Sequence, residues 1–265
     1  MKNLRDAQLI MLDILNEVDR ICKKNNIEYF LISGTLLGAH RHKGFIPWDD
    51  DLDIAMTREN YNKFVSIVNN EIKSEYFVQT DKTDKFYDKY QIPLKIRHMK
   101  SKIISPYEIN KNFNKGIFID IFPMDILDSR KRGIKMYNSY KKIYSFICLE
   151  PIPIYNVRNI FKYFINILFN KVDKIKLREK IVYKITKNLN EEDKSYVCFG
   201  VETPWNVMYE YSDVFPLKQI EFEGYNYYAP NNICKILQKS FGDTYMSLPK
   251  EEDRHWHALA IEIDE

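Results

Sequence analysis

The feature that most constrains this chain is a run of acids that leads directly into an apolar strand-like segment. Within Trp48–Met56, WDDDLDIAM, four of five consecutive residues are aspartates, namely Asp49, Asp50, Asp51 and Asp53. Side chains alternate between the two faces of a strand, so Asp51 and Asp53 are predicted to leave one face while Leu52 enters the core. Two carboxylates on one face repel each other unless a cation lies between them.

A third acid stands in a second apolar run. Asp120 lies within IFIDIFPMD, where a lone carboxylate is costly to bury unless it is paired or bound to a metal. Carboxylate oxygens suit Mg²⁺ or Mn²⁺, which take their remaining ligands from water and substrate phosphates. The acids therefore predict a metal site. The alternatives are a solvated loop for the acid run and an ion pair with a lysine for Asp120.

Two further segments are predicted to contact phosphate. Ser33-Gly34-Thr35 links a strand to a helix, and the exposed N–H groups and hydroxyls of such a helix start can take a phosphate, although an ordinary turn has the same residues. Lys95 and Arg97 alternate in PLKIRH and so share a strand face. They are expected to meet a diphosphate, or else to be solvated on an edge strand.

Composition limits the class of protein. The 265 residues are 45% hydrophobic and 14% aromatic, enough to bury a sizeable core. The four cysteines form no CxxC pair, which favours a reducing compartment without disulfides or a zinc site. The N-terminus lacks the apolar core of a signal peptide, and no segment approaches the ~18 apolar residues of a membrane span. We therefore expect a cytoplasmic protein.

Hydrophobic periodicity predicts a mixed α/β domain with a small buried sheet. The expected helices are an N-terminal amphipathic helix through Cys22, a short helix from Thr35 to His42, a helix capped by Thr57, and a helix from about Asn231. The expected strands are IEYFLI, LDIAM, YFVQT, YQIPLKIRH and GIFIDIFPMDIL, with a hairpin-like segment in FEGYNYYAP. We assign residues 1–130 to a catalytic core, 131–200 to a basic helical insertion and 201–265 to a segment that packs back on the core.

The insertion differs from the rest of the chain in charge. Lys131 to Lys187 holds 14 basic and three acidic residues, a balance of +11 against +3 for the whole chain. Such segregation would attract an anionic partner, either a phosphate-rich glycan precursor or the anionic inner face of the membrane. The apolar segment IFKYFINILF could lie in the membrane interface. The alternative is an ordinary helical subdomain with solvated lysines.

GTLLGAHRHKGFIPWDDDLDIAM followed by GIFIDIFPMD closely resembles the LicD family of phosphocholine transferases, which are related to fukutin and belong to the nucleotidyltransferase-fold superfamily. The resemblance covers about Phe30–Met56, Gly116–Asp125 and Glu221–His257. It implies a polymerase-beta-type fold, with a small mixed sheet flanked by helices. Gly34 and Thr35 match the superfamily's glycine-hydroxyl turn.

The resemblance also implies a reaction. Asp51 and Asp53 match the metal-binding pair and Asp120 the third acid, which either shares the Mg²⁺ or Mn²⁺ ion or takes the acceptor proton. The family transfers phosphocholine from CDP-choline to a hydroxyl of a cell-surface glycan and releases CMP. We expect a glycan or teichoic-acid precursor as acceptor, lipid-linked or free, and no nucleic acid. Phosphoethanolamine or another alcohol phosphate is an open alternative to phosphocholine.

Other residues are expected around these ligands or at the substrate. The spacing from Thr35 to Asp51 is slightly longer than is usual in the superfamily, so Asp49 and Asp50 could instead orient Arg41 or Lys43. A quaternary ammonium is held by aromatic faces, for which Trp48, Trp205 and several tyrosines are available. His255 and His257 are predicted to meet a phosphate or to take part in proton transfer, or else to be a surface pair, and Asp125 is a further candidate near the metal ligands or the substrate.

Two competing functions stay open from the sequence. The acid pair also suits a nucleotidyltransferase that moves a nucleoside monophosphate from a triphosphate to a small acceptor. The basic segment also suits a non-catalytic glycan- or nucleic-acid-binding protein. Consumption of CDP-choline against nucleoside triphosphates distinguishes the first two, and tight nucleic-acid binding without turnover would indicate the third.

Overall fold

The computed structural model describes residues 2–87, 92–106, 109, 111–128, 134–135, 137–142, 174–186, 191–203, 205–254, 256 and 258–263. Its helices are α1 (Lys2–Lys24), α2 (Ser33–His42), α3 (Arg58–Glu71), α6 (Lys174–Thr186), α7 (Tyr211–Val214) and α8 (Ile233–Phe241), with short turns η1 (Glu191–Asp193) and η2 (Glu251–Asp253). Its strands are β1 (Phe30–Leu31), β2 (Asp53–Thr57), β3 (Tyr76–Gln79), β4 (Lys95–His98), β5 (Ser101–Ile104), β6 (Phe118–Asp128), β7 (Lys194–Phe199), β8 (Met208–Glu210), β9 (Lys218–Phe222), β10 (Tyr225–Ala229) and β11 (Ala260–Ile263).

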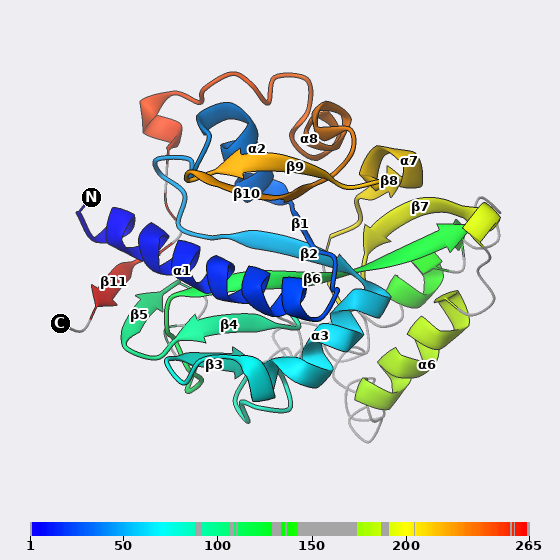
Figure 1. Ribbon diagram of the computed structural model, residues 1–265, viewed down its shortest axis with the longest axis horizontal. Coiled ribbons are helices and arrows are strands. Elements are labelled where there is room, and N and C mark those ends of the chain that lie inside the picture. Colours follow the sequence, from blue (N-terminus) through cyan, green and yellow to red (C-terminus); the bar gives the residue numbers. More distant parts are fainter. Residues whose placement is uncertain are drawn as a thin grey trace, which may run out of the picture.

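A seven-stranded mixed sheet forms the centre of the molecule (Figure 1). Its order is β1-β2-β6-β4-β3, with β7 beside β6 and β8 beside β7. β2 and β6 run parallel, and the other neighbours are antiparallel. The long strand β6 pairs with β2 on one edge, while β4 and β7 share its other edge. β4 takes the first part of this edge and β7 the last part, so the sheet divides between them.

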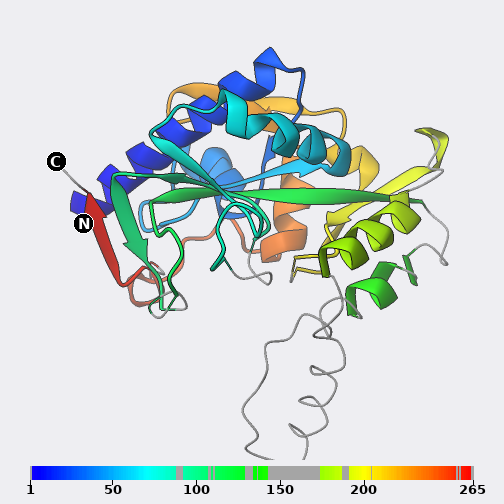
Figure 2. The same cartoon turned by 90° about the horizontal axis from the view of Figure 1, so that it is seen from below.

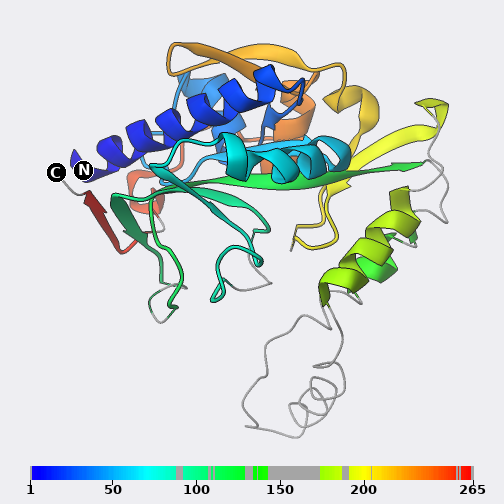
Figure 3. The ribbon, with the colours of Figure 1, turned by 60° about the horizontal axis from the view of Figure 1, so that its bottom comes forward.

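Two helices cover one face of this sheet. α1 and α3 lie over the same side of β6 in two views (Figures 2 and 3). The predicted apolar stripe of α1 is confirmed, since Met11, Ile14 and Val18 are fully buried. The predicted cap of α3 is also present, because the Thr57 side chain accepts a hydrogen bond from the Asn60 N–H at 3.4 Å.

The mixed α and β composition predicted from the sequence is confirmed, with local differences. The strand expected over residues 27–32 is only Phe30–Leu31, and α2 begins two residues earlier than expected. The hairpin β9–β10 and helix α8 are present, and the Asn232 side chain caps α8 by accepting from the Lys235 N–H. Two pairings were not predicted, β5 with β11 and β7 with β8. Both bring together segments whose partners are not evident from periodicity alone.

The basic insertion is described only in part. Residues 134–135 and 137–142 are helical, and α6 lies on the opposite side of β6 from α1 and α3 (Figures 2 and 3). The expected interfacial helix at 160–169 lies outside the described residues, so the prediction of membrane contact stays untested. Among the residues described, no helix is both long and apolar enough to cross a membrane.

A buried ion cluster connects α3 to the C-terminal half of β6. Arg58, the first residue of α3, binds Asp125 through Nε at 2.7 Å and through Nη2 at 3.2 Å. Its Nη1 and Nη2 atoms also bind the two Glu202 carboxylate oxygens at 2.6 and 2.8 Å. The Asp125 side chain is fully buried and that of Glu202 is 3% exposed. This cluster fixes the segment after β7 against α3.

We expect Arg58→Met to lower the free energy of unfolding by about 3–5 kcal/mol, because it leaves two buried carboxylates without their cation. Urea denaturation followed by circular dichroism measures this change. The matched control is Lys102→Met, which removes a partner of the exposed Glu262 and should cost less than about 1 kcal/mol. Equal losses of stability for the two substitutions would contradict a stabilising role of the buried Arg58 cluster.

Candidate functional site

One row of charged residues crosses three neighbouring strands. Asp53 on β2 is in register with Asp120 on β6, and Asp120 is in register with Lys95 on β4. The Lys95 Nζ atom lies 2.6 Å from Asp120 Oδ1, and all three residues are buried. Lys95 Nζ also lies 3.5 Å from the centroid of the Phe118 ring. The alternative that Asp120 pairs with a lysine is thus confirmed, and it does not exclude a role at the site.

Two more acids reach this row from the loop that precedes β2. Burial, followed by the charges of Asp51 and Asp120, raises the pKa of Asp53 well above its ordinary value. Burial and the neighbouring Asp51 charge raise the pKa of Asp49 to about 9. Asp51 precedes the strand rather than lying in it, since β2 begins at Asp53. Asp49 and Asp51 are thus close enough to interact electrostatically with Asp53, but Asp51 lies in the loop before β2 and not in the strand, so the predicted metal pair stays a prediction.

The start of α2 lies against the same acids. The Thr35 hydroxyl accepts a hydrogen bond from the Asp53 backbone N–H at 2.7 Å, which ties the helix to the start of β2. A Cβ atom at Gly34 would lie 2.8 Å from Asp49 Oδ2, so glycine permits this close approach. Ile32 precedes α2 and provides no side-chain cap. The start of α2 therefore lies beside Asp49 and has no side-chain cap from Ile32.

The structure places Arg97 and Lys95 in the interior. β4 lies between β3 and β6, so the alternative of solvated residues on an edge strand is wrong for both. Arg97 is 0% exposed; its guanidinium donates to Gln79 Oε1 at 2.5 Å and to the Gly116 carbonyl at 2.8 Å. These contacts support β4 from within. Contact of Arg97 with a diphosphate remains a sequence prediction.

The acidic loop also fixes the C-terminal segment of the chain. Asp50 Oδ2 accepts from the Ala258 N–H at 2.6 Å, and the Arg41 guanidinium donates to the carbonyls of Tyr245 and Ser247. The Arg254 guanidinium carbon lies 4.7 Å from the Trp48 ring centroid. Arg41 thus connects α2 to the segment that follows α8.

Two other groups of candidate residues do not join this row in the structure. Asp125 lies five residues beyond Asp120 on β6, an odd spacing that turns it to the α3 face, where Arg58 binds it. The predicted substrate contacts His255 and His257 lie outside the described residues.

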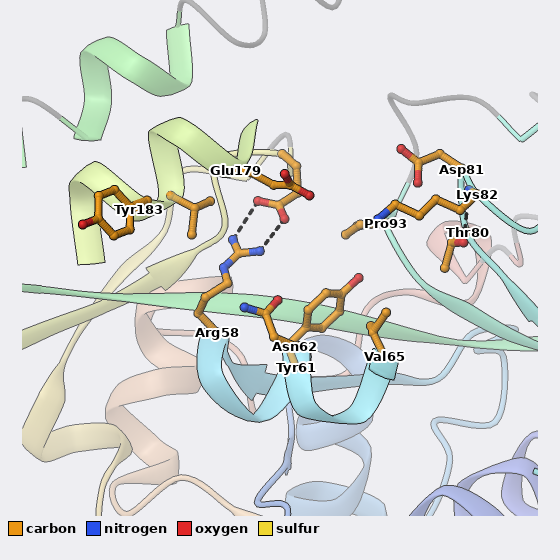
Figure 4. Close-up of a pocket in the computed structure, with 12 residues that line it drawn as sticks. Arg58, Tyr61, Asn62, Val65, Thr80, Asp81, Lys82, Pro93, Glu179 and Tyr183 are labelled. Atoms are coloured by element: carbon orange, nitrogen blue, oxygen red, sulfur yellow. Dashed lines mark hydrogen bonds and ion pairs between the residues drawn. The ribbon is translucent and has the colours of Figure 1, made fainter. Parts of the chain in front are cut away.

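Two cavities open elsewhere on the described surface. The first, about 380 Å³, lies where the sheet divides and is lined by Arg58, Tyr61, Glu179 and Glu202 among others (Figure 4). The second, about 570 Å³, adjoins the start of α3 and includes Thr57, Tyr211 and Phe215. The residues that line these two cavities do not include the four acids.

The donor chemistry of the acids fits a divalent cation. Burial raises the pKa of Asp120 to about 6 even though Lys95 lowers it, and the nearby Asp51 charge raises it further. Hard carboxylate oxygens beside an uncapped helix start are suited to Mg²⁺ or Mn²⁺ with a phosphate ligand. In the part of the chain that is described, no three potential ligands are already gathered tightly around one point.

Comparison with known proteins decides the family. Residues 26–146 match the family described as LicD/FKTN/FKRP, nucleotidyltransferase domain. The chain is 30% identical to the lipopolysaccharide cholinephosphotransferase LicD of Haemophilus influenzae, over 97% of this chain and 96% of that protein. This chain belongs to the LicD family. It is therefore a transferase.

Two uncharacterized proteins are similar over shorter segments. One, from Rickettsia typhi, is 45% identical over 60 residues, which are 23% of this chain and 19% of that protein. Another, from Rickettsia prowazekii, is 32% identical over 117 residues, which are 44% of this chain and 40% of that protein. The matched family segment contains the acid run, the α2 start and the Lys95–Asp120 pair.

Two structural roles are not predicted from the sequence. They are the hydrogen bond that Thr35 accepts and the contacts of Lys141 with backbone carbonyls. The sequence predicts a phosphate contact for the glycine-hydroxyl turn, whereas the hydrogen bond from the Asp53 N–H to the Thr35 hydroxyl depends on how β2 packs against α2. Lys141 is 5% exposed and donates to the Trp205 and Gly200 carbonyls. Nothing in the sequence distinguishes it from the other basic residues of its segment.

Thr35→Val should lower the free energy of unfolding by about 1–3 kcal/mol, because the buried Asp53 N–H loses its acceptor. Thr35→Ser keeps the oxygen and should retain most of the stability. Urea denaturation measures the free energy of unfolding of both variants. Equal losses of stability would show that the hydroxyl oxygen of Thr35 is not the group that stabilises the protein.

Asp49→Asn should stabilise the protein by about 1–2 kcal/mol in metal-free buffer at pH 7, because the wild-type Asp49 carboxylate must take up a proton on folding, whereas asparagine need not. The raised pKa of Asp49 means that the folded wild type loses stability as pH rises from 3.8 toward about 9, so the gain should shrink as pH approaches 3.8. Thermal denaturation in the presence of a chelator measures this gain in stability. A lower melting temperature for Asp49→Asn than for the wild type would contradict the raised pKa of Asp49.

Proposed function

We propose that this transferase moves phosphocholine from CDP-choline to a hydroxyl of a cell-surface glycan, such as lipopolysaccharide or a teichoic-acid precursor, and releases CMP. The observation that carries the proposal is the row Asp53–Asp120–Lys95 beside the uncapped start of α2. The named activity of the Haemophilus influenzae relative supports choline phosphate as the group and lipopolysaccharide as the acceptor class. The family match supports a polymerase-beta-type arrangement of β2 and β6.

Asp51 and Asp53 would hold a Mg²⁺ or Mn²⁺ ion, with Asp120 as the third carboxylate. Such an ion supplies neutralising charge and orientation for a diphosphate. The structural support is that burial, followed by the charges of neighbouring carboxylates, raises the pKa of both Asp53 and Asp120.

The protein's own groups would bind and orient the donor. The first N–H groups of α2 offer hydrogen bonds to one phosphate, and Gly34 keeps that approach open. Lys95 places a buried ammonium beside Asp120, where it favours the negative charge of the reacting group. The acceptor oxygen forms a bond to the phosphorus that carries choline, and the bond from this phosphorus to the CMP oxygen breaks.

Asp120 is the proposed acceptor of the hydroxyl proton. Burial raises its pKa to about 6, which is close to the pH at which a general base is effective. The nearby Lys95 keeps part of the population ionised. We further propose that the enzyme works on the cytoplasmic side, where its basic segment, residues 131–187, would face anionic lipid or a phosphate-rich acceptor.

The test incubates the purified protein with Mg²⁺, CDP-choline and lipopolysaccharide and follows CMP release and choline incorporation. Asp53→Asn should lower the rate by more than about 100-fold, since even outer contacts of a metal site contribute 10–100-fold. Asp120→Asn should lower kcat far more than it raises KM for the donor.

The matched control is Asp13→Asn, which makes the same change at an exposed position on α1 and should leave the rate unchanged. Consumption of nucleoside triphosphates instead of CDP-choline would overturn the proposal in favour of nucleotidyl transfer. A wild-type rate for Asp53→Asn would show that the row of Asp53 and Asp120 does not take part in the reaction.

A further inference from the structure

Trp205 is an exposed tryptophan whose ring packs on Phe122, two residues after Asp120 on β6. The Trp205 and Phe122 rings are nearly perpendicular, with centroids 5.1 Å apart at 87°, and the Trp205 centroid lies 5.8 Å from that of Phe199. Phe122 and Phe199 are buried, whereas Trp205 is 41% exposed. Part of the indole is therefore packed against the sheet while the rest remains accessible to a ligand.

The position of this indole relative to the acids follows from the strand register. Phe122 is two residues after Asp120, so both side chains leave the same face of β6, roughly 6.8 Å apart along the strand. Ala55 on β2 is the in-register neighbour of Phe122. Because Trp205 packs on Phe122 and Phe199, it lies on the same face of the sheet as Asp120, beyond the acid row along β6.

The segment that carries Trp205 is fixed at several points. The Lys141 ammonium donates to the carbonyl oxygens of Trp205, Phe199 and Gly200 and to the Tyr137 hydroxyl. On the opposite side, Glu202 is bound by Arg58. Because these contacts already fix the segment, the Trp205 ring needs little further ordering when a ligand binds.

Other aromatic candidates are less suited. One face of Trp48 is already covered by the Arg254 guanidinium, and the His42 ring lies 6.1 Å from its centroid. Among the residues described, Trp205 is the exposed aromatic residue whose ring packs on an aromatic ring of β6. A cation near it would also experience the negative charge of the aspartates.

We propose that the exposed face of Trp205 binds the quaternary ammonium of the donor and so determines choline as the transferred alcohol. This inference rests on the proposed function. A trimethylammonium group has no N–H to donate, so an aromatic face in a negative field recognises it, whereas a primary ammonium gains less by leaving water. Trp205 is thus a specificity-determining contact.

The experiment compares CDP-choline with CDP-ethanolamine for the wild type, Trp205→Leu and Trp205→Phe. Trp205→Leu should raise KM for CDP-choline by about 3- to 30-fold, the effect of losing one cation–π contact. It should change KM for CDP-ethanolamine by less than about twofold on the same scale. Trp205→Phe keeps a ring and should retain most of the preference.

Tyr225→Leu is the matched control, because it removes an exposed aromatic ring on the β9–β10 hairpin and should alter neither KM. Circular dichroism checks the folding of each variant. Equal changes for both donors, or none for either, would overturn the assignment of Trp205 while leaving phosphocholine transfer in place.

A second measurement does not depend on turnover. Isothermal titration with phosphocholine and with phosphoethanolamine, in the presence of Mg²⁺, gives the binding preference of the wild type and of Trp205→Leu directly. Preference for phosphocholine that is lost in Trp205→Leu supports the proposal. Identical preference in both proteins overturns it, even if no donor is turned over and the proposed function itself fails.

Discussion

The concentration of negative charge in a buried row is the constraint on which the rest of this structure depends. Asp53 and Asp120 stand side by side on parallel strands, and Asp49 and Asp51 approach from the loop before β2. Without neutralisation such an arrangement is unfavourable, because each carboxylate loses water and repels its neighbours. The surrounding fold supplies one lysine, one helix start and a firm sheet, and together they hold the acids in place.

Strand β6 keeps two ionic systems apart. On one face Asp120 pairs with Lys95, and on the other Asp125 is bound by Arg58 together with Glu202. The odd spacing of the two aspartates produces this separation, since side chains alternate along a strand. Arg58 binds two carboxylates with one positive charge, and the Lys141 ammonium also interacts electrostatically with both, whereas Asp53 and Asp120 share the charge of Lys95. The same strand therefore stabilises the fold on one face and presents a charged site on the other.

The segments that complete the site come from distant parts of the chain. Asp50 holds the backbone at Ala258, and Arg41 holds the carbonyls after α8, so the acidic loop and the C-terminal segment fix each other. Lys141 and Arg58 fix the segment after β7 from two sides. Because these contacts are charge-assisted hydrogen bonds to buried groups, they define one arrangement rather than several.

The sequence alone determined the elements near the acids and the family. Alternation in LDIAM and IFIDIFPMD, the Thr57 cap and the stripe of α1 are local patterns, and local patterns survive without tertiary information. Tertiary structure alone decided which lysine meets Asp120, why Arg97 is buried, and that Asp125 faces Arg58. It also decided that Trp48 is covered by Arg254 while Trp205 remains exposed. These outcomes depend on strand order and on which loop reaches which face, and strand order is set by packing between residues far apart in the chain, which periodicity does not record.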